Sequence, residues 1–467
     1  MKQFLIVLLL CVATGVPAKE KVCEVERPSI VERVVNRSYP SVFATWTHEI
    51  ANEPIPENVW DWSYKKKVLS RRDLHWQLSF NAEVGFQYLT PDVEFPNLVF
   101  RRARYAEDAI NARQQIQSLN PDYLFLASFQ YYAAHPSDHY PEDWPYWLRD
   151  EAGNRIQDIP FKEFLIDYTL PGAEDHFVHM AVSVAKCGIF DGIFMDAWSE
   201  DEADVPGVDS AAHLYHGNRV EALVSLVKRI REAVGDEFLI IVNTRTEKIP
   251  RSAPYVNGAF IETWDAAYPR ERLIEIEKAL SWYEENLRYP QINALEIRIN
   301  PKEPWDSPAN RRLARATTTL SLTHSNGYIL ILGKNFLPYW YSFFDADLGR
   351  PVGEKGQLYE AIDGLFIREF TNGWAVYNRS GEPQQITLPA TTKGWHSKVE
   401  GTAHALPDLD GEIYLRVQVA DLNGDGVVNI LDLVIVANGF NGPEPDLNGD
   451  GVVNILDLVL VSNSIGK

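Results

Sequence analysis

Residues 189–198, IFDGIFMDAW, decide the fold prediction. A short apolar run ends on Asp196, and an acidic, turn-rich segment follows at residues 199–209. Buried parallel strands are near-continuous apolar runs, and α/β barrels carry their functional side chains at the carboxyl ends of strands. The stretch therefore predicts a strand that delivers Asp196 to a barrel mouth. Asp191 lies five residues earlier, and this odd offset places it on the opposite face of the strand.

Strand-like and helix-like segments alternate on both sides of this stretch, which favours βαβ units and a parallel sheet. Strands are predicted at residues 73–81, 122–131, 163–168, 192–198, 237–243, 258–264, 292–299 and 327–332. Helices are predicted at residues 106–119, 172–187, 211–234, 269–287, 310–324 and 356–366. Eight strands over residues 42–366 match a (β/α)8 TIM barrel, which needs roughly 250 residues or more. The alternative is a doubly wound sheet, which usually has a Gly-rich phosphate turn that this chain lacks.

The amino terminus has the composition of a secretory signal peptide over residues 1–18. Its apolar run is too short to span a membrane, and no other stretch is long and apolar enough. Residues 19–41 are polar, and we expect them to form a leader. Cys23 and Cys187 would remain after cleavage and could pair, although the fold does not depend on a disulfide framework. We therefore expect a secreted protein, free or associated with a cell surface or scaffold.

Composition narrows the possible partners. The chain has 467 residues and a formal net charge of −21, which argues against general binding to nucleic acid or anionic membranes. It also has 13 Trp, 21 Tyr and 21 Phe residues, which can pack a core or stack on sugar rings. Residues 367–418 contain short β-prone pieces separated by Gly and Pro, which predicts a small antiparallel β domain that braces the barrel.

The carboxyl terminus contains a repeat, because residues 421–432 recur almost unchanged at 446–457. Oxygen side chains occupy loop positions 1, 3, 5, 9 and 12, with Gly at position 6 and a backbone carbonyl available at position 7, as in EF-hand calcium loops. Position 12 is Asp where an ordinary EF-hand has Glu, and the helix before each loop is missing. The predicted ligands of two Ca²⁺ ions are Asp421, Asn423, Asp425, Val427, Asn429, Asp432, Asp446, Asn448, Asp450, Val452, Asn454 and Asp457.

Residues 420–467, two such loops each followed by an apolar helix at 433–438 and 458–463, resemble a dockerin module. The resemblance implies a calcium-folded unit that binds a cohesin-like protein. It also implies a role in partner recognition for positions 10 and 11 of each loop, which are Ile430, Leu431, Ile455 and Leu456. The segment has a net charge of −6, so we expect it to be largely unfolded without calcium.

Polar residues at the predicted strand ends supply the candidate catalytic groups. Asp196 and Glu262 stand out because each closes an apolar strand and is soon followed by Trp. Two carboxylates on the fourth and sixth strands can face each other across a sugar ring, as glycoside hydrolysis requires, with their spacing deciding retention or inversion. Substrate binding is predicted for Asp167, Trp198, Asn243, Arg245, Trp264 and Glu296.

Three strands, DGIFMDAW, GAFIETW and FLIDYTLP, resemble strand-end motifs of the glycoside-hydrolase-like barrels of bacteria over roughly residues 42–380. The resemblance implies a secreted bacterial glycosidase that needs no cofactor for catalysis. The DG-x-x-x-D strand also resembles the fourth strand of α-amylase and α-galactosidase types, which implies that Asp196 is the nucleophile. The α-galactosidase type implies Glu262 as acid/base, whereas amylases use a fifth-strand Glu where this chain has Asn243.

Two other classes of function compete with a glycosidase. A degenerate barrel could bind carbohydrate or associate with a scaffold without catalysis. A metal-dependent polysaccharide deacetylase would need a His/Asp cluster, and the sequence shows none. His135 and His139 are expected on the surface of the long loop at 132–161, although their spacing permits a weak metal site.

Overall fold

The computed structural model describes residues 29–465, except 46, 48, 59–60, 78–102, 135–139, 159–161, 188, 205–208, 266, 418–419 and 425–426. The predicted signal peptide, Cys23, His135, His139 and Asp425 lie outside the described residues, as does the side chain of Cys187.

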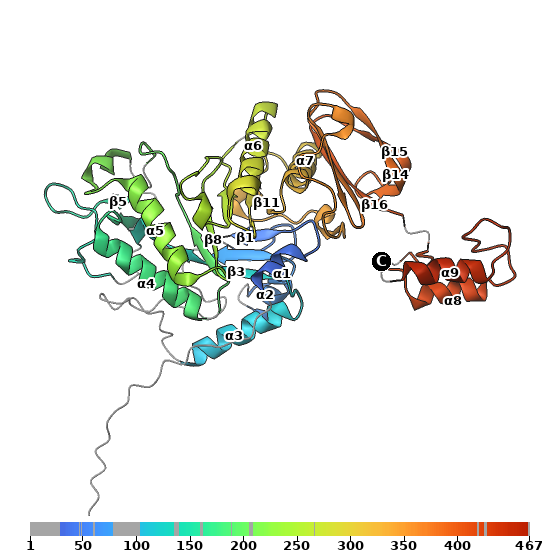
Figure 1. The fold of residues 1–467 in the computed structure, drawn as a ribbon, viewed down its shortest axis with the longest axis horizontal. Coiled ribbons are helices and arrows are strands. Elements are labelled where there is room, and N and C mark those ends of the chain that lie inside the picture. Colours follow the sequence, from blue (N-terminus) through green and yellow to red (C-terminus); the bar gives the residue numbers. More distant parts are fainter. Residues whose placement is uncertain are drawn as a thin grey trace, which may run out of the picture.

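The central feature is an eight-stranded parallel sheet. In order its strands are β1 (Phe43–Thr45), β2 (Leu74–Gln77), β3 (Leu124–Phe129), β7 (Gly192–Met195), β8 (Leu239–Asn243), β9 (Gly258–Ile261), β10 (Ala294–Arg298) and β11 (Tyr328–Leu332). A parallel bridge between Val42 and Ile329 brings the first and last strands together. The predicted barrel is therefore confirmed (Figure 1), and by the strand order residues 192–195 are its fourth strand.

One of the eight predicted barrel strands lies outside the barrel. Residues 163–168 contribute β6 (Glu163–Leu165), which pairs antiparallel with β4 (Ala133–Ala134) and β5 (Gln157–Asp158) in a separate small sheet. Parallel neighbours need a long crossover, usually a helix, and the described residues between β3 and β6 contain no α-helix. The three-residue strand β1, which was not predicted, takes the first place in the barrel, and 73–81 contains its second strand.

Six helices accompany the barrel strands: α2 (Trp62–Leu69), α3 (Ala103–Gln117), α4 (Pro171–Cys187), α5 (Arg219–Val234), α6 (Arg270–Asn286) and α7 (Pro308–His324). The leader prediction needs correction, because residues 30–35 form helix α1 and Ile30 and Val34 pack into the interior cluster of the barrel. The predicted helix at 356–366 is also wrong. Glu360 and Ala361 adopt left-handed backbone angles, with φ of 48° and 59°, which an α-helix cannot continue through.

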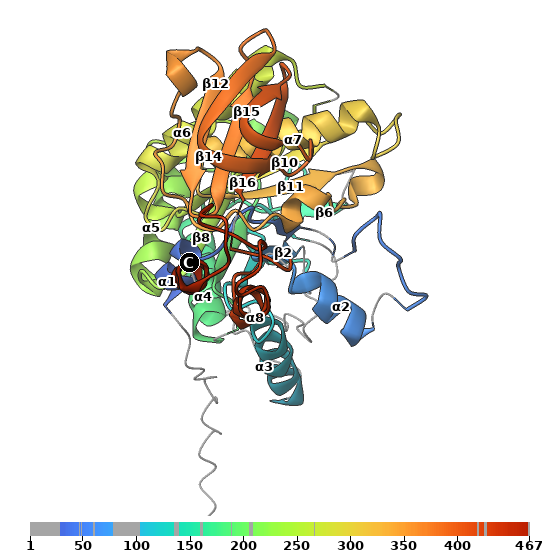
Figure 2. The ribbon, with the colours of Figure 1, turned by 90° about the vertical axis from the view of Figure 1, so that its right-hand side faces the viewer.

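A five-stranded antiparallel sheet follows the barrel, as predicted for this region. Its order is β12 (Leu365–Phe370), β13 (Gly373–Asn378), β16 (Asp410–Arg416), β14 (Gln384–Gly394) and β15 (Glu400–Leu406). Figures 1 and 2 show the sheet beside α7. Buried ion pairs link it to the barrel helices, with Arg379 Nε 2.7 Å from Glu277 Oε1 and Arg315 Nη2 2.7 Å from Asp410 Oδ2. The sheet therefore braces one side of the barrel.

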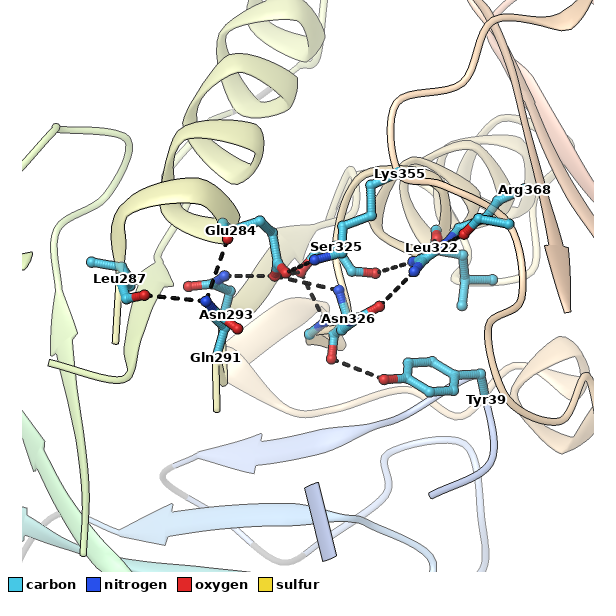
Figure 3. Close-up of polar contacts among 12 residues, drawn as sticks. Tyr39, Glu284, Leu287, Gln291, Asn293, Leu322, Ser325, Asn326, Lys355 and Arg368 are labelled. Atoms are coloured by element: carbon cyan, nitrogen blue, oxygen red, sulfur yellow. Dashed lines mark hydrogen bonds and ion pairs between the residues drawn. The ribbon is translucent and has the colours of Figure 1, made fainter. Parts of the chain in front are cut away.

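A polar network closes the amino-terminal end of strands β10 and β11 (Figure 3). Buried Glu284 accepts hydrogen bonds from Asn293 Nδ2 at 2.7 Å, Ser325 Oγ at 2.6 Å and Lys355 Nζ at 2.6 Å. Arg368 of β12 donates to the Leu322 and Ser325 carbonyls at 3.0 and 2.9 Å. These bonds stabilise the end of the barrel that lies away from the strand carboxyl ends, where stability rather than catalysis is usually decided.

The last two helices are α8 (Ile430–Asn438) and α9 (Ile455–Ser464). Each begins with a capping box, formed by Asn429 and Asp432 in α8 and by the corresponding Asn454 and Asp457 in α9. Their small core is made of Ala420, Val428, Val436, Val453 and Val461. None of the helices that the structure describes has the length and apolar composition needed to cross a membrane.

Candidate active site

Four aromatic rings from four barrel strands form the floor of the mouth. They are Phe43, Trp76, Phe194 and Phe260, and all are fully buried. The Trp76 ring stacks on Phe43 of β1 and Phe194 of β7, with centroids 5.1 and 4.8 Å apart. Phe260 of β9 packs edge-on against Trp76, with centroids 5.2 Å apart. Asp196 lies two residues after Phe194. Glu262 likewise lies two residues after Phe260. Because side chains along a strand alternate between its two faces, both carboxylates point inward like the rings, and they lie nearer the carboxyl ends of the strands.

Asn243, at the end of β8, links the two carboxylates. Its Nδ2 donates to Asp196 Oδ1 at 2.8 Å and to Glu262 Oε2 at 2.9 Å. The Arg245 N–H donates to Asn243 Oδ1 at 3.2 Å, which identifies the oxygen of the amide and points its nitrogen at the two acids. Because both bonds meet at one nitrogen, the accepting oxygens are no more than 5.7 Å apart, the sum of the two lengths.

The backbone at the two strand ends is strained. Ala197 and Arg245 adopt φ values of 50° and 55° in the left-handed region, which costs a non-glycine residue about 1–3 kcal/mol. The turn at Ala197 lets its N–H donate to Asp196 Oδ1 at 2.8 Å, and Tyr131 Oη holds the Ala197 carbonyl at 2.8 Å. Strain of this kind persists only where surrounding contacts enforce it, and here it orients Asp196.

Burial changes the protonation of both acids. It raises the pKa of Asp196, while hydrogen bonds from Asn243 and the Ala197 N–H and the charge of Arg245 act in the opposite direction. The pKa of Glu262 is raised by burial and then by the negative charge of Asp196, and Asn243 and Arg298 oppose this shift. Two close carboxyls titrate as a coupled pair, which favours a state with one proton and one negative charge over a state with two negative charges.

Glu296 and Arg298 on β10 extend this pair into a network. Arg298 Nη2 lies 3.1 Å from Glu262 Oε1, and its Nε lies 2.9 Å from Glu296 Oε1. Glu296 is fully buried, and its Oε2 has no hydrogen-bond partner among the residues that the structure describes. Burial, reinforced by the charge of Glu262, raises the pKa of Glu296 to about 8. We predicted that Glu296 binds substrate, but the structure places it behind Glu262, against Arg298.

The rim of the mouth carries an exposed indole. Trp264 is 62% exposed, with the Arg298 guanidinium 3.6 Å from its ring centroid and the Phe336 ring edge-on at 5.6 Å. The contact of Trp264 with a sugar ring stays a prediction. The Arg245 side chain is also exposed, and its nearest carboxylate is that of Asp204, at 3.7 Å.

Two predicted substrate contacts are placed elsewhere by the fold. Trp198 is 2% exposed, donates from Nε1 to Ser252 Oγ at 3.2 Å and packs against Tyr131. Its ring has no face to offer a sugar, because the left-handed turn at Ala197 redirects the chain after Asp196.

Asp167 follows β6 of the small sheet rather than a barrel strand, and it is 1% exposed. Its Oδ2 lies 2.5 Å from Nδ1 of His216, whose side chain is 74% exposed. The acid therefore orients a histidine that sequence reasoning missed. Arg298 was missed too, although it lies two residues after Glu296 and so shares its inward-facing register.

Asp191 lies at the opposite end of β7, as its odd offset predicts. Its carboxylate pairs with Arg33 at 2.5 Å and Arg113 at 2.6 Å and accepts the Phe125 N–H at 2.9 Å. The two guanidinium groups hold the pKa of this buried acid well below its usual range. Arg33 belongs to α1, so Asp191 anchors the leader helix to the base of the barrel.

The second terminal loop brings its polar side chains together. Asp450 Oδ2 lies 2.9 Å from both Asn448 Nδ2 and Asn454 Nδ2, so loop positions 3, 5 and 9 converge on one point. Gly451, at position 6, has a φ of 95°, the sharp turn that this position requires. Among the described residues no three His, Cys, Asp or Glu side chains form a metal-sized group, and Asp457 instead accepts three backbone N–H groups.

A parallel barrel with an inward carboxylate pair at its carboxyl-end mouth has the architecture of a glycoside hydrolase. The family model of hypothetical glycosyl hydrolase family 15 matches residues 116–374, more than half of the chain. The chain therefore belongs to this family, and it is a glycoside hydrolase.

Comparison with solved structures finds distant similarities. A maltogenic α-amylase, AmyB from Thermotoga neapolitana, is 12% identical, with 83% of this chain and 99% of that one covered and a TM-score of 0.47. An isomalto-dextranase from Arthrobacter globiformis is 12% identical, with 84% of this chain and 75% of that one covered and a TM-score of 0.49. A search of curated protein sequences finds no match.

Proposed function

We propose that the protein is a secreted glycoside hydrolase that cleaves its glycan with retention of anomeric configuration. The bridge through Asn243 is the observation that carries this proposal. It keeps an oxygen of Asp196 within 5.7 Å of an oxygen of Glu262. Retaining enzymes place their carboxyl groups about 5–5.5 Å apart, whereas inverting enzymes need about 6.5–9.5 Å to admit a water molecule.

In this proposal Asp196 is the nucleophile and Glu262 the acid/base. The Ala197 N–H and Asn243 stabilise the ionised form of Asp196. The charge of Asp196 in turn raises the pKa of Glu262, which favours a proton on that side chain. An Asp196 oxygen attacks the anomeric carbon while the glycosidic C–O bond breaks, and the Glu262 proton passes to the leaving oxygen. Glu262 then removes a proton from the water that hydrolyses the glycosyl ester.

The test begins with a screen of soluble starch, dextran, xylan, galactomannan and pectin for reducing-end release. On the polymer that is cleaved, Asp196→Asn and Glu262→Gln should each abolish hydrolysis, with circular dichroism unchanged. Wild-type-like turnover by either variant contradicts the assignment. Binding without release by the wild type would favour a non-catalytic carbohydrate-binding protein instead.

Retention is tested separately, by following the first-formed anomer with NMR. A matched 2-deoxy-2-fluoro glycoside should leave its sugar attached to the wild type and not to Asp196→Asn, as judged by intact mass. The opposite anomer as first product would show that the spacing argument is wrong.

For the carboxyl terminus, we propose a calcium-folded docking module that binds a cohesin-like protein and attaches the secreted enzyme to a scaffold or cell surface. The two complete loops support it, as do the apolar pairs at positions 10 and 11. Ile430, Leu431, Ile455 and Leu456 are 54–65% exposed, which is unusual for large apolar side chains without a partner surface.

Limited proteolysis of the full chain tests calcium folding. Residues 420–467 should be protected in about 10 mM Ca²⁺, which exceeds the Kd of about 0.1–1 mM typical of extracellular calcium modules, and cleaved when EGTA is added. The matched variant Asp446→Ala/Asp450→Ala removes ligands from the second loop and should lose protection there even with calcium. Equal cleavage in both conditions would contradict the calcium reading.

A further inference from the structure

A hollow lies among segments that follow the barrel strands, and its lining includes neither Asp196 nor Glu262. It is a cavity of about 430 Å³, within the range of about 300–1,000 Å³ that ligand pockets occupy. Its walls come from the segments after β1, β10 and β11, from α7 and from the turn between β14 and β15. We call it the seam cavity, and the residues used below are Asn52, Trp305, Arg311, Trp340, Asp345 and His396.

The aromatic wall of the seam cavity is held in one position. Trp340 and Asn52 exchange two hydrogen bonds, from the Trp340 N–H to Asn52 Oδ1 at 2.9 Å and from Asn52 Nδ2 to the Trp340 carbonyl at 2.8 Å. The indole Nε1 donates to Asp345 Oδ1 at 2.9 Å, and the Arg71 guanidinium lies 3.9 Å from the ring centroid. A half-buried ring fixed in this way loses little conformational freedom when a ligand packs against it.

A second indole is positioned from the other side. Tyr341 Oη donates to the Trp305 carbonyl at 2.8 Å, and the Trp305 ring stacks on Tyr339 with centroids 5.8 Å apart. The cavity therefore combines two ordered indoles with polar groups at their edges. Sugar rings require this combination, because they present apolar C–H faces and peripheral hydroxyl groups.

Two polar groups in the lining have unused hydrogen-bonding capacity. The imidazole of His396 has no hydrogen-bond partner among the described residues, and only its backbone N–H is engaged, by Glu412. The Arg311 guanidinium is about half exposed, with the Asp306 carboxylate 3.7 Å away. A packing defect between two domains would not need such groups directed into it.

The segment after β11 connects the seam cavity to the catalytic mouth. At one end it carries Phe336, which is 45% exposed and packs edge-on against Trp264 beside Arg298 and Glu262. A few residues later it carries Trp340, in the cavity wall. Exposed aromatic rings thus lie both at the acids and at the cavity.

We propose that the seam cavity binds a sugar unit of a polysaccharide, away from the bond that is cleaved, so that the enzyme prefers a polymer over a short glycoside. This inference rests on the proposed glycosidase function. Binding at the cavity adds affinity only for a substrate long enough to reach it, so the preference should disappear when the indole is removed.

The experiment compares Trp340→Ala with Trp340→Phe, which keeps an aromatic face and serves as the matched control. On the polymer cleaved in the screen, Trp340→Ala should lower kcat/KM roughly tenfold, because the sugar loses one aromatic face, and this factor corresponds to about 1.4 kcal/mol. On the 4-nitrophenyl glycoside of the same sugar, both variants should stay within about twofold of wild type. Trp340→Phe should recover most of the activity on the polymer.

Binding without turnover is measured in the Asp196→Asn background. Electrophoresis through gels that contain each polymer of the screen should show retardation that falls with Trp340→Ala and with His396→Ala. Equal losses on polymer and small glycoside would assign Trp340 to barrel structure and overturn the proposal, as would retardation unchanged by both substitutions. If no polymer is hydrolysed but retardation still depends on Trp340, the proposed catalysis fails while the binding site stands.

Discussion

Replacing Glu296 by Gln should make the protein more stable at alkaline pH. The pKa of Glu296 rises from 4.5 to about 8 on folding because the carboxyl is fully buried beside Glu262. Between these values the folded chain holds a proton that the unfolded chain releases, so this group lowers stability as pH rises. The difference between these two pKa values corresponds to about 5 kcal/mol, since a pKa difference of one is worth about 1.36 kcal/mol. Stability is lost progressively from about pH 4.5 to pH 8.

Gln keeps an oxygen that can accept from Arg298 Nε but cannot ionise. The difference in unfolding free energy, Glu296→Gln minus wild type, should therefore increase with pH and approach a gain of about 5 kcal/mol above pH 8 relative to its value below pH 4.5. Other groups titrate in both proteins and largely cancel in this difference. Glu296→Leu also removes the titration but loses the bond to Arg298, so its curve should be parallel and displaced toward lower stability at every pH.

The assay is guanidinium unfolding of the full chain, followed by tryptophan fluorescence at five pH values from 4.5 to 9. Because the chain has more than one domain, the comparison uses the unfolding free energy of the barrel transition alone, measured for the variant and the wild type under the same conditions. A difference that does not change with pH would refute the reasoning, because Glu296 would then ionise alike in the folded and unfolded chains.

Two further predictions concern neighbouring groups. Asn243→Ala should lower kcat/KM roughly 100-fold, because Asp196 and Glu262 lose the donor that holds them together. Misplacement of a catalytic group by about 1 Å costs about that factor. An activity near wild type would mean that catalysis does not use the bridge. Asp191→Asn should destabilise the barrel by about 3–5 kcal/mol, because Arg33 and Arg113 would be left buried without their anion. The pH profile of its remaining activity should match wild type, and a shifted profile would contradict a purely structural role.

The barrel could be predicted because most of its strands are apolar runs followed by a helix. The run at 192–195 and the four later strands each stand out locally, and their parallel pairing follows from the helices between them. The three residues of β1 are too few to show a pattern. Residues 163–168 have a strand's composition, but composition does not determine the partner, and without a helix after β3 the segment turns back on its own loop.

The same limit applies to the site. Asp196, Asn243 and Glu262 were predicted because strand ends of a barrel meet at one mouth, and their contacts now show how they meet. His216 could not be found in this way, since it reaches Asp167 from 49 residues away through loop conformation alone. Trp198 was misplaced for a related reason, because a single left-handed residue reverses the direction of the side chains after it.

The contacts of Asn243 also explain why an amide and not an acid stands at the end of the fifth barrel strand. A carboxylate at that position would be a third negative charge beside Asp196 and Glu262, in a pocket that already raises the pKa of both. An amide has the same size and supplies donors without charge, so both acids can approach one nitrogen. The close spacing on which the proposed retention depends is therefore a consequence of this neutral side chain. By the same reasoning Asn243→Asp should impair catalysis more than Asn243→Ala, since it replaces attraction by repulsion rather than by an empty space.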